Sequence, residues 1–210
     1  MTSLGARLIA AMNRFNAARP WDHNAHYHRL ILRQLPEKPR SALDIGCGTG
    51  EFARKLAATG ARVDGIDTDP AAIAEAARTG GGVRYLTADV RTARLDRYAA
   101  VVSIATVHHL PLTEALPLLR GLLEPGGTLV VLGLYREHTI TDRLLGLTAV
   151  AANLLVAALR GRNTPRTPPM CTGPAREALA RIRSAAATQL PGARIRRRLF
   201  WRYILVYEHP

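Results

Sequence analysis

The stretch Leu43-Asp44-Ile45-Gly46-Cys47-Gly48-Thr49-Gly50 decides the fold of this chain. It predicts a strand that runs into three closely spaced glycines, followed by a helix that begins near Glu51. Because glycine has no Cβ, the backbone can turn sharply there and let a ligand approach closely. The free N–H groups at the start of the helix suit a polar or anionic ligand. The segment therefore predicts a nucleotide-type pocket at the end of a strand.

The glycines alone fit two classes of cofactor. Gly48-Thr49-Gly50-Glu51-Phe52-Ala53 matches the dinucleotide pattern G-x-G-x-x-G/A, so a nicotinamide or flavin oxidoreductase is one alternative. Against it, the tight turn starts at Gly46, which gives the spacing G-x-G-x-G. In addition, about 40 residues precede the first strand, whereas a dinucleotide-binding domain often opens close to its first strand.

A carboxylate ends the second predicted strand, Ala61–Asp67. Asp67 lies roughly 20 residues beyond the glycines, the separation at which a carboxylate can accept hydrogen bonds from a ribose diol. Thr68-Asp69-Pro70 then predicts the start of a helix, with Asp69 as its N-cap and Pro70 in its first turn. A solvated acid at a strand end is the alternative for Asp67, but the order and spacing favour the ribose role.

Strands and helices alternate along the following sequence. A third strand, Val83–Val90, contains Asp89 near its end, and a fourth, Ala99–Ala105, is apolar on both faces, as a buried parallel strand should be. A helix over Leu112–Leu123 leads to a turn at Glu124-Pro125-Gly126-Gly127 and a strand over Thr128–Leu134. This alternation predicts right-handed βαβ units and an α/β fold with a doubly wound sheet.

The C-terminal sequence predicts a pair of antiparallel strands. Ala193–Leu199 and Trp201–Glu208 are two strands with almost nothing between them. They must be antiparallel, because a parallel crossover needs a dozen or more residues. The segment Pro174–Leu190 before them predicts a helix.

These motifs together resemble the class I S-adenosylmethionine-dependent methyltransferases, in particular their broad small-molecule branch (methyltransferase type 11/25-like). The matching pieces are LDIGCGTG, VDGID, TADV, VVSIATVHHL and LEPGGTLVV, in the family's order and at its usual spacings over residues 40–135. The resemblance implies a Rossmann-like, three-layer αβα fold. Its seven-stranded sheet would be mostly parallel and would close with an antiparallel C-terminal hairpin. It also implies S-adenosyl-L-methionine as cofactor and S-adenosyl-L-homocysteine as product.

The resemblance also assigns cofactor-binding residues. In the family the glycine loop wraps the methionine part, the acid after the second strand holds the ribose, and the acid after the third contacts the adenine. The end of the fourth strand lines the other side of the cofactor. Carried over to this sequence, the residues are Asp44, Gly46, Cys47, Gly48 and Gly50, then Asp67 with Thr68, then Asp89 with Val90, and Ile104 with Ala105.

Two histidines are the first candidates for catalysis. A sulfonium methyl is already a strong electrophile, so the enzyme mainly has to align the reactants and exclude water. A hydroxyl or protonated amine acceptor also needs a general base, and His is suited to that role near neutral pH. His108 and His109 follow the fourth strand, and we expect His108 to face the pocket and His109 to be structural. The alternatives are that the rings only pack or cap the next helix, and that alignment alone suffices.

The segment Pro20–Arg29 supplies the other catalytic candidates, because related enzymes often fold this region over the sulfonium and the acceptor. Tyr27 and His26 are the residues that could lie within the active site. His23, His26 and His28 cannot all share one helix face, so the spacing does not predict a metal site. No further acidic pair is present for a metal, and we expect none.

We expect a single domain over residues 1–210, a length that buries a sizeable core. Residues 1–39 would form an N-terminal helical cap, and residues 137–173 an inserted helix and lid above the acceptor. The apolar run Leu144–Leu159 is short for a membrane span. It would pack on the sheet, roof an apolar substrate pocket, or touch a membrane surface peripherally.

Cysteine usage and the N-terminus predict the compartment. Cys47 and Cys171 form no disulfide framework, and the N-terminus has no continuous apolar stretch of the kind found in signal peptides. We therefore expect a cytoplasmic protein.

The net charge of +13 raises the question of an anionic partner. The densest cluster is Arg194, Arg196, Arg197, Arg198 and Arg202. A solvated strand face is one explanation, and nucleic acid, an acidic lipid surface or a phosphorylated substrate is the other. Motifs for base methylation are missing after the fourth strand, where Ala105-Thr106-Val107-His108-His109-Leu110 stands. No basic stretch is interleaved with the aromatics that a stacking platform needs.

The sequence thus predicts a methyltransferase that moves a methyl group to a small metabolite, either hydrophobic or polar, by in-line displacement. An RNA or protein methyltransferase that uses the Arg-rich C-terminal face is the alternative within the class. A cofactor-binding module without transfer activity is the alternative outside enzymology.

Overall fold

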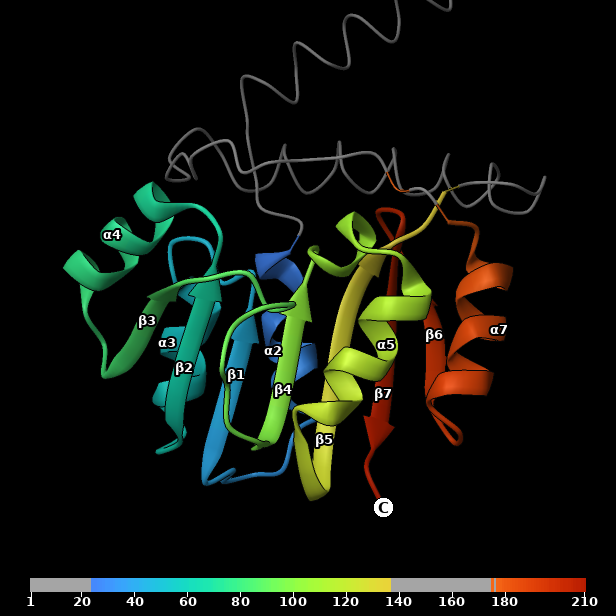
Figure 1. Ribbon diagram of the computed structural model, residues 1–210, viewed down its shortest axis with the longest axis horizontal. Coiled ribbons are helices and arrows are strands. Elements are labelled where there is room, and N and C mark those ends of the chain that lie inside the picture. Colours follow the sequence, from blue (N-terminus) through green and yellow to red (C-terminus); the bar gives the residue numbers. More distant parts are fainter. Residues whose placement is uncertain (1–23, 137–174, 176) are drawn as a thin grey trace, which may run out of the picture.

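The computed structural model describes residues 24–136, 175 and 177–210. Within them the chain forms one seven-stranded sheet in the order β3-β2-β1-β4-β5-β7-β6 (Figure 1). The strands are β1 (Ser41–Ile45), β2 (Arg62–Asp67), β3 (Val83–Thr87), β4 (Tyr98–Ile104), β5 (Leu123–Leu134), β6 (Arg194–Arg198) and β7 (Arg202–Glu208).

Strand pairing confirms the predicted doubly wound sheet with an antiparallel hairpin. β1 lies between β2 and β4 and is parallel to both, and β3 and β5 extend the parallel part on either side. β7 is antiparallel to both β5 and β6. The carboxyl ends of β1, β2 and β4 therefore meet at one edge of the sheet, where ligands bind in open α/β folds.

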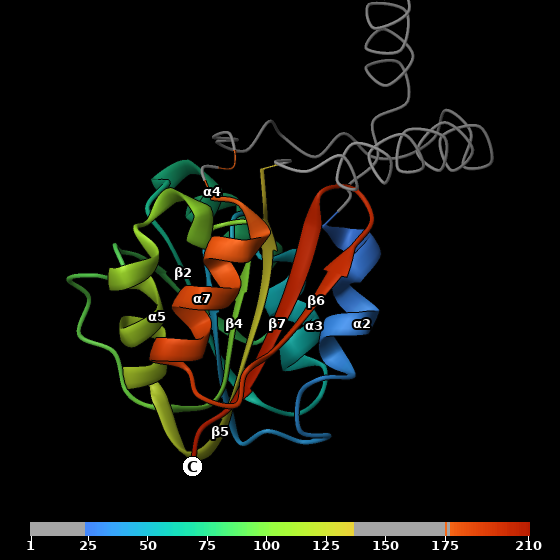
Figure 2. The same ribbon diagram turned by 90° about the vertical axis from the view of Figure 1, so that its right-hand side faces the viewer.

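Helices cover both faces of the sheet and complete the three layers. Figure 2 shows α5 and α7 on one side and α2 and α3 on the other. The helices are η1 (Ala25–Tyr27), α2 (His28–Leu32), α3 (Glu51–Ala57), α4 (Pro70–Thr79), η2 (Val107–His109), α5 (Leu112–Gly121) and α7 (Leu179–Gln189), of which η1 and η2 are 3₁₀ turns.

The core lies in two layers because the central strands are apolar on both faces. One layer joins α5 and α7 to the sheet through Leu116, Leu119, Ile182, Ala186, Val131 and Leu205. The other joins α2 and α3 to the opposite face through Ile31, Phe52, Leu56, Val102, Val130 and Ile204.

Several element boundaries differ from those expected. α7 begins at Leu179, five residues after the expected Pro174. β5 already begins at Leu123, where the sequence predicted the end of a helix. Leu123 pairs with Tyr98, and the Pro-Gly-Gly turn becomes an irregularity inside β5 before regular pairing resumes at Thr128. A Gly is required in this irregularity because Gly126 has a φ of 76°.

The hairpin turn between β6 and β7 is held by the N-terminal helices. Phe200 and Trp201 both have left-handed backbone, with φ values of 58° and 56°, which is costly for bulky side chains. The Tyr27 hydroxyl donates a hydrogen bond to the Leu199 carbonyl at 3.0 Å. The Arg202 guanidinium donates to the Asn24 side-chain oxygen at 2.9 Å. These bonds fix the turn from outside the hairpin.

The expected lid over 137–173, with its apolar run Leu144–Leu159, lies outside the described residues. So do residues 1–23 of the expected N-terminal cap. In the part of the chain that the structure describes, no helix is both long enough and apolar enough to cross a bilayer.

Candidate functional site

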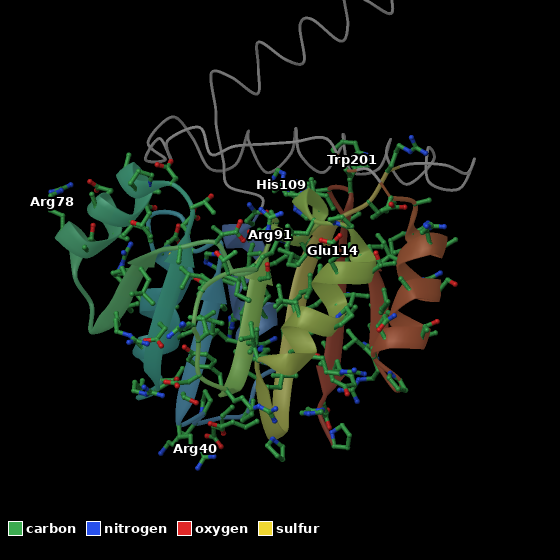
Figure 3. The ribbon with its side chains drawn as sticks, viewed as in Figure 1. Arg40, Arg78, Arg91, His109, Glu114 and Trp201 are labelled. Atoms are coloured by element: carbon green, nitrogen blue, oxygen red, sulfur yellow. The ribbon has the colours of Figure 1, made fainter. Side chains whose placement is uncertain are left out.

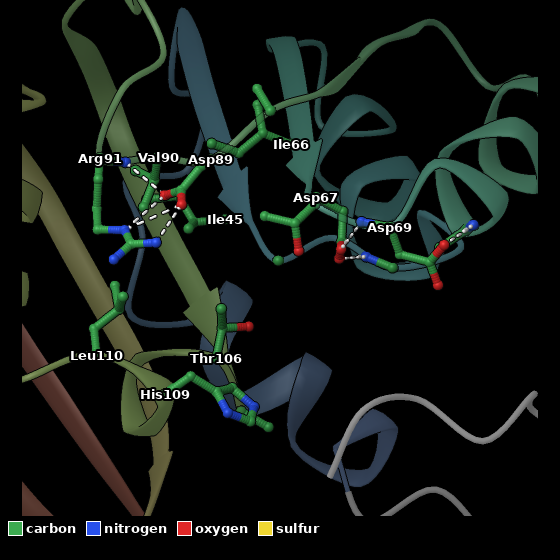
Figure 4. A pocket seen from close by; sticks show the side chains of 16 residues that line it. Ile45, Ile66, Asp67, Asp69, Asp89, Val90, Arg91, Thr106, His109 and Leu110 are labelled. Atoms are coloured by element: carbon green, nitrogen blue, oxygen red, sulfur yellow. Dashed lines mark hydrogen bonds and ion pairs between the residues drawn. The ribbon is translucent and has the colours of Figure 1, made fainter. Parts of the chain in front are cut away.

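A pocket of about 410 Å³ lies at the carboxyl edge of the parallel strands. Figure 3 shows His109, Arg91 and Trp201 near this edge, with Arg40 at the opposite one. The pocket is lined by the ends of β1 and β2, the start of α4, the segment after β3 and the segment after β4 (Figure 4). Its residues are Ile45, Gly46, Gly48, Ile66, Asp67, Thr68, Asp69, Ala72, Ala88, Asp89, Val90, Arg91, Ala105, Thr106, His109 and Leu110.

The glycine loop brings the backbone close to its neighbours. Gly46 has a φ of 72°, and a Cβ there would overlap the side chain of Thr106. Gly50 has a φ of 76°, and a Cβ there would overlap the ring and hydroxyl of Tyr85. Both positions therefore require Gly for two reasons, the left-handed backbone and the lack of space. The loop backbone consequently packs closely against Thr106 and Tyr85, and its glycines add no side chains to the space that a ligand would occupy.

Asp67 is fixed by the backbone around it. Its Oδ2 accepts a hydrogen bond from the N–H of Gly48 at 2.8 Å, and its Oδ1 accepts one from the N–H of Asp69 at 3.0 Å. Each carboxylate oxygen has further lone pairs, so the group can still accept hydrogen bonds from a ligand in the pocket. The first bond also ties the glycine loop of β1 to the end of β2.

Asp44 is a buried carboxylate with an unfilled acceptor position. The residue is 2% exposed, and its Oδ2 has no hydrogen-bond partner among the described residues. Burial, together with the negative charge of Asp67, raises the pKa of the Asp44 carboxyl to about 7. A buried oxygen without a partner is costly. A positively charged ligand group near Asp44 would remove this cost.

Asp89 is engaged by an arginine that the sequence analysis did not identify. Arg91 donates from its backbone N–H at 2.9 Å and from Nη2 at 2.6 Å to the Asp89 carboxylate. The hydrogen bonds and charge of Arg91 hold the pKa of the Asp89 carboxyl below its ordinary value. Figure 4 shows this pair on the wall opposite Asp67 and Asp69. In the sequence, an acid two residues before an arginine at the end of a strand was the pattern that could have predicted this pair.

The segment after β4 places the two histidines in different surroundings. Ala105 has left-handed backbone, with a φ of 52°, and lines the pocket with Thr106 and His109. His108 instead lines a second cavity, of about 230 Å³. His108 was expected to face the pocket and His109 to be structural. In the structure His109 lines the cofactor pocket and His108 the second cavity, and the catalytic role of either ring stays a prediction. The short η2 turn rotates successive side chains in different directions, which the sequence does not reveal.

Tyr27 and His26 lie away from the cofactor pocket. Tyr27 is buried among the residues of α2, α3 and the sheet, and its hydroxyl is bonded to the hairpin turn. The His26 ring meets the edges of Tyr27 and Phe200 with centroids 4.9 and 5.9 Å apart. Neither residue lines the pocket in the described part of the chain. Their observed contacts are those of residues that hold the N-terminal helices on the hairpin.

Of the sequence-predicted residues, eight line the pocket: Gly46, Gly48, Asp67, Thr68, Asp89, Val90, Ala105 and His109. Asp44, Cys47 and Gly50 lie in β1 and the glycine loop, and Ile104 ends β4, but all four are outside the lining. The lining residues that sequence reasoning missed as ligand contacts are Ile45, Ile66, Asp69, Ala72, Ala88, Arg91, Thr106 and Leu110. The sequence did indicate the position of Asp69, as the predicted N-cap of a helix. The structure shows this cap, because the Asp69 side chain accepts hydrogen bonds from the backbone N–H groups of Ala71 and Ala72.

The residues present fit an adenosyl ligand that carries an ammonium group. The unfilled Asp44 oxygen suits a cation, Asp67 suits a diol, and the loop glycines leave space between them. Among the described residues, no three His, Cys, Asp or Glu side chains cluster closely enough to hold a metal ion.

Comparison with known proteins identifies the family. A family model described as a methyltransferase domain matches residues 42–127. The chain is 34% identical over 196 residues to an uncharacterized methyltransferase of Mycobacterium tuberculosis strain H37Rv, covering 91% of this chain and 98% of that protein. The chain belongs to the class I S-adenosylmethionine-dependent methyltransferases. The methyltransferase uses S-adenosylmethionine as its methyl donor.

Two further similarities are to enzymes whose names include a substrate. It is 37% identical over 121 residues to the trans-aconitate 2-methyltransferase of Streptomyces avermitilis, covering 51% of this chain and 45% of that one. Its fold is similar to the magnesium protoporphyrin IX methyltransferase of Synechocystis PCC 6803 with bound S-adenosylhomocysteine. That similarity has a TM-score of 0.57 at 18% identity and covers 96% of this chain and 84% of that one.

Proposed function

We propose that the methyltransferase transfers a methyl group to a small metabolite with an apolar body. The observation that supports this is the second cavity of about 230 Å³, which shares Leu110 with the cofactor pocket. Its wall is mainly apolar, with Pro111, Leu112, Leu134 and Ile182 among its residues. A confined apolar cavity beside the cofactor suits a small molecule better than a folded polymer.

The proposed cofactor contacts follow from the geometry of the pocket. Asp67, held by two backbone N–H groups, would accept hydrogen bonds from the ribose diol. Asp44 would face the ammonium of the methionine part through its unfilled oxygen. Val90, beside Asp89, would line the adenine site. Arg91 occupies acceptor positions of Asp89, so the adenine amino group would compete with Arg91 for that carboxylate.

The proposed mechanism needs little covalent chemistry from the protein. S-adenosylmethionine supplies a methyl group on a sulfonium, with a neutral leaving group. Gly46 and Thr106 lie close together in the wall of the cofactor pocket, and Leu110 lines both cavities and so marks the boundary between them. His108 and His109 lie on either side of this boundary with ring centroids 4.0 Å apart. One of these rings would accept the proton of a hydroxyl or amine acceptor.

The arginine cluster gives only partial support to a polyanionic substrate. Arg194 pairs with Glu208 at 3.1 Å, Arg197 lies 5.5 Å from the centre of the Tyr135 ring, and Arg202 is bonded to Asn24. These three side chains have contacts within the protein that explain their presence. Methylation of RNA or protein is therefore the second candidate function rather than the first.

The test of the proposed function has two parts. S-adenosylhomocysteine is titrated calorimetrically into the wild type and into Asp67→Ala. We expect the affinity of Asp67→Ala to be at least tenfold lower, because loss of a charged acceptor for the ribose diol costs about 1.5–3 kcal/mol. Asp96→Ala, a change at an exposed carboxylate outside the pocket, is the control. Equal affinities for wild type and Asp67→Ala would remove the ribose assignment.

The second part identifies the class of acceptor. The wild type is incubated with S-adenosylmethionine carrying a radioactive methyl group and a dialysed or undialysed cell extract. We expect label in the low-molecular-mass fraction, and only with the undialysed extract. Label in the RNA or protein fraction would favour the polymer alternative. Binding of S-adenosylhomocysteine without label in any fraction would favour a module that lacks transfer activity.

A further inference from the structure

The Tyr203 side chain on β7 is buried, and its hydroxyl has no hydrogen-bond partner among the described residues. The hydroxyl oxygen is not among their fully buried unpaired atoms, so it keeps some open space beside it. The residue is 3% exposed, and burial alone raises the pKa of its phenol above the ordinary value, with no partner acting in the opposite direction. Most hydroxyl groups of buried residues bond to protein or water, so a hydroxyl without a protein partner in the wall of a cavity can donate to a ligand there. Tyr207 on the same strand shows the usual case, because its hydroxyl lies 3.4 Å from Nδ1 of His209.

The position of Tyr203 is fixed by the strand beside it. Tyr203 pairs with Gly133 of β5, and a Cβ on Gly133 would overlap the Tyr203 ring and hydroxyl. The missing side chain of Gly133 therefore makes the space in which the ring lies. Gly in the interior of a strand weakens the strand and often marks a close approach of another group. The ring is thus held in place before any ligand arrives.

Tyr203 forms part of the wall of the second cavity. The other residues of the wall are His108, Leu110, Pro111, Leu112, Leu134, Glu177 and Ile182. The volume of about 230 Å³ exceeds the roughly 150 Å³ at which an apolar protein cavity accepts benzene. It is smaller than the roughly 300–1,000 Å³ of pockets for drug-sized ligands. The cavity therefore suits a group the size of one ring.

The wall also restricts the charge of the occupant. Glu177 is the acidic residue of the wall, and its carboxylate lies 3.6 Å from Nε of Arg181. The carboxylate gives an anionic group in the cavity no attraction, and the Arg181 charge beside it is already paired. A neutral group with one oxygen fits the apolar surface and the single hydroxyl of Tyr203.

We propose that this cavity is the acceptor subsite and that Tyr203 is a specificity-determining residue, whose hydroxyl donates a hydrogen bond to an oxygen of a neutral, ring-sized part of the methyl acceptor. The proposal rests on the proposed function, because the cavity adjoins the cofactor pocket at Leu110. It adds the chemical class of the acceptor group and the residue that selects it.

Phenol and toluene are the probes, because they have the same shape and differ in one hydroxyl. The wild type with ¹³C-labelled Leu and Ile methyl groups is titrated with each probe and followed by NMR. We expect both probes to shift the methyl signals of Leu112, Leu134 and Ile182. Tyr203→Phe should weaken phenol binding about three- to tenfold and leave toluene binding unchanged, since only phenol loses a hydrogen bond.

Two further variants provide controls. Tyr207→Phe removes a buried hydroxyl from the same strand at a distance from the cavity, and should leave the affinity for both probes unchanged. Leu134→Phe adds volume to the wall and should weaken both probes together. If Tyr203→Phe leaves phenol affinity unchanged, or if neither probe shifts the three methyl signals, the proposal is wrong.

The failure of this proposal can be separated from failure of the proposed function. S-adenosylhomocysteine is titrated into the same samples. If it binds and phenol does not enter the cavity, only the acceptor subsite is overturned. If it does not bind to the wild type, the methyl-transfer function fails, whatever phenol does.

Discussion

At the residue scale, two neighbouring carboxylates are held in opposite ways. Asp67 accepts hydrogen bonds on both oxygens, whereas Asp44 is buried with one oxygen unfilled. The first arrangement positions an acceptor before the ligand arrives. The second leaves a group whose charge is stabilised only when a cation comes close. Affinity for the cofactor should therefore depend on the protonation of Asp44.

The raised pKa of Asp44 gives a prediction about stability. The pKa is about 7 in the folded protein against an ordinary value of 3.8, so folding favours the protonated form. The stabilisation from this group is fully present below about pH 4 and is lost as pH rises through 7. We compare the free energy of unfolding of the unliganded wild type with that of Asp44→Asn. As the pH rises from about 4 to about 7, the wild-type value should fall relative to the variant by about 1.4 kcal/mol per pH unit, a few kcal/mol in all.

Urea unfolding at several pH values, followed by circular dichroism, checks this prediction. Asp44→Asn serves as the reference because other carboxylates titrate equally in both proteins. A difference in stability that does not change with pH would show that Asp44 is ionised throughout. Wild-type affinity for S-adenosylhomocysteine should rise over the same interval, because an ionised Asp44 attracts the ammonium group.

The two histidines give a second prediction at this scale. His109 lines the cofactor pocket, so His109→Ala should weaken binding of S-adenosylhomocysteine. His108 lines the acceptor cavity, so His108→Ala should lower kcat with unchanged cofactor affinity, by about 100-fold or more if His108 is the general base. Calorimetry and turnover at saturating cofactor measure the two effects. Undiminished turnover in both variants would mean that alignment alone drives the transfer.

At the element scale, the strands and the glycine loop could be predicted because their signals are local. The apolar strand before Gly46 and the spacing to Asp67 depend on a few neighbouring residues. The direction of the His108 and His109 rings depends on how the η2 turn is rotated against β5, and the Tyr203 contact depends on the register between β5 and β7. These features arise from tertiary packing, which no local pattern encodes.

The pairing of Gly133 with Tyr203 gives a prediction about β5. Gly133→Ala would place a Cβ where the Tyr203 ring lies, and overpacking of this kind costs about 1–3 kcal/mol. The free energy of unfolding should fall by this amount, measured by urea denaturation. Gly121→Ala is the matched control, since Gly121 ends α5 with open space around it. It should be neutral or stabilising by up to about 1 kcal/mol. Equal stabilities for the two variants would contradict the packing argument.

At the scale of the whole molecule, the net charge of +13 does not by itself define a partner. Several cluster arginines have contacts within the protein, but Arg196 is exposed on the edge strand β6. Its charge is the one that a polyanion would meet first. Composition could not distinguish these cases, because it does not show which arginines are engaged.

Reversal of the Arg196 charge tests the role of this face. Arg196→Glu should leave methyl transfer to the low-molecular-mass fraction and its salt dependence within about twofold of wild type, since exposed charges far from the site are screened. Arg78→Glu, on the surface of α4, is the control. A large, salt-sensitive loss in Arg196→Glu alone would favour a polyanionic partner.

The contact of Tyr27 with Leu199 has a consequence for synthesis of the chain. The two residues are 172 positions apart, and the turn at Phe200 and Trp201 has backbone angles unfavourable for its own side chains. The N-terminal helices therefore cannot reach the carbonyl they hold until the chain as far as Leu199 has left the ribosome. Until then, the apolar face of α2 lacks part of its final packing partner and is exposed to other chains in the cell.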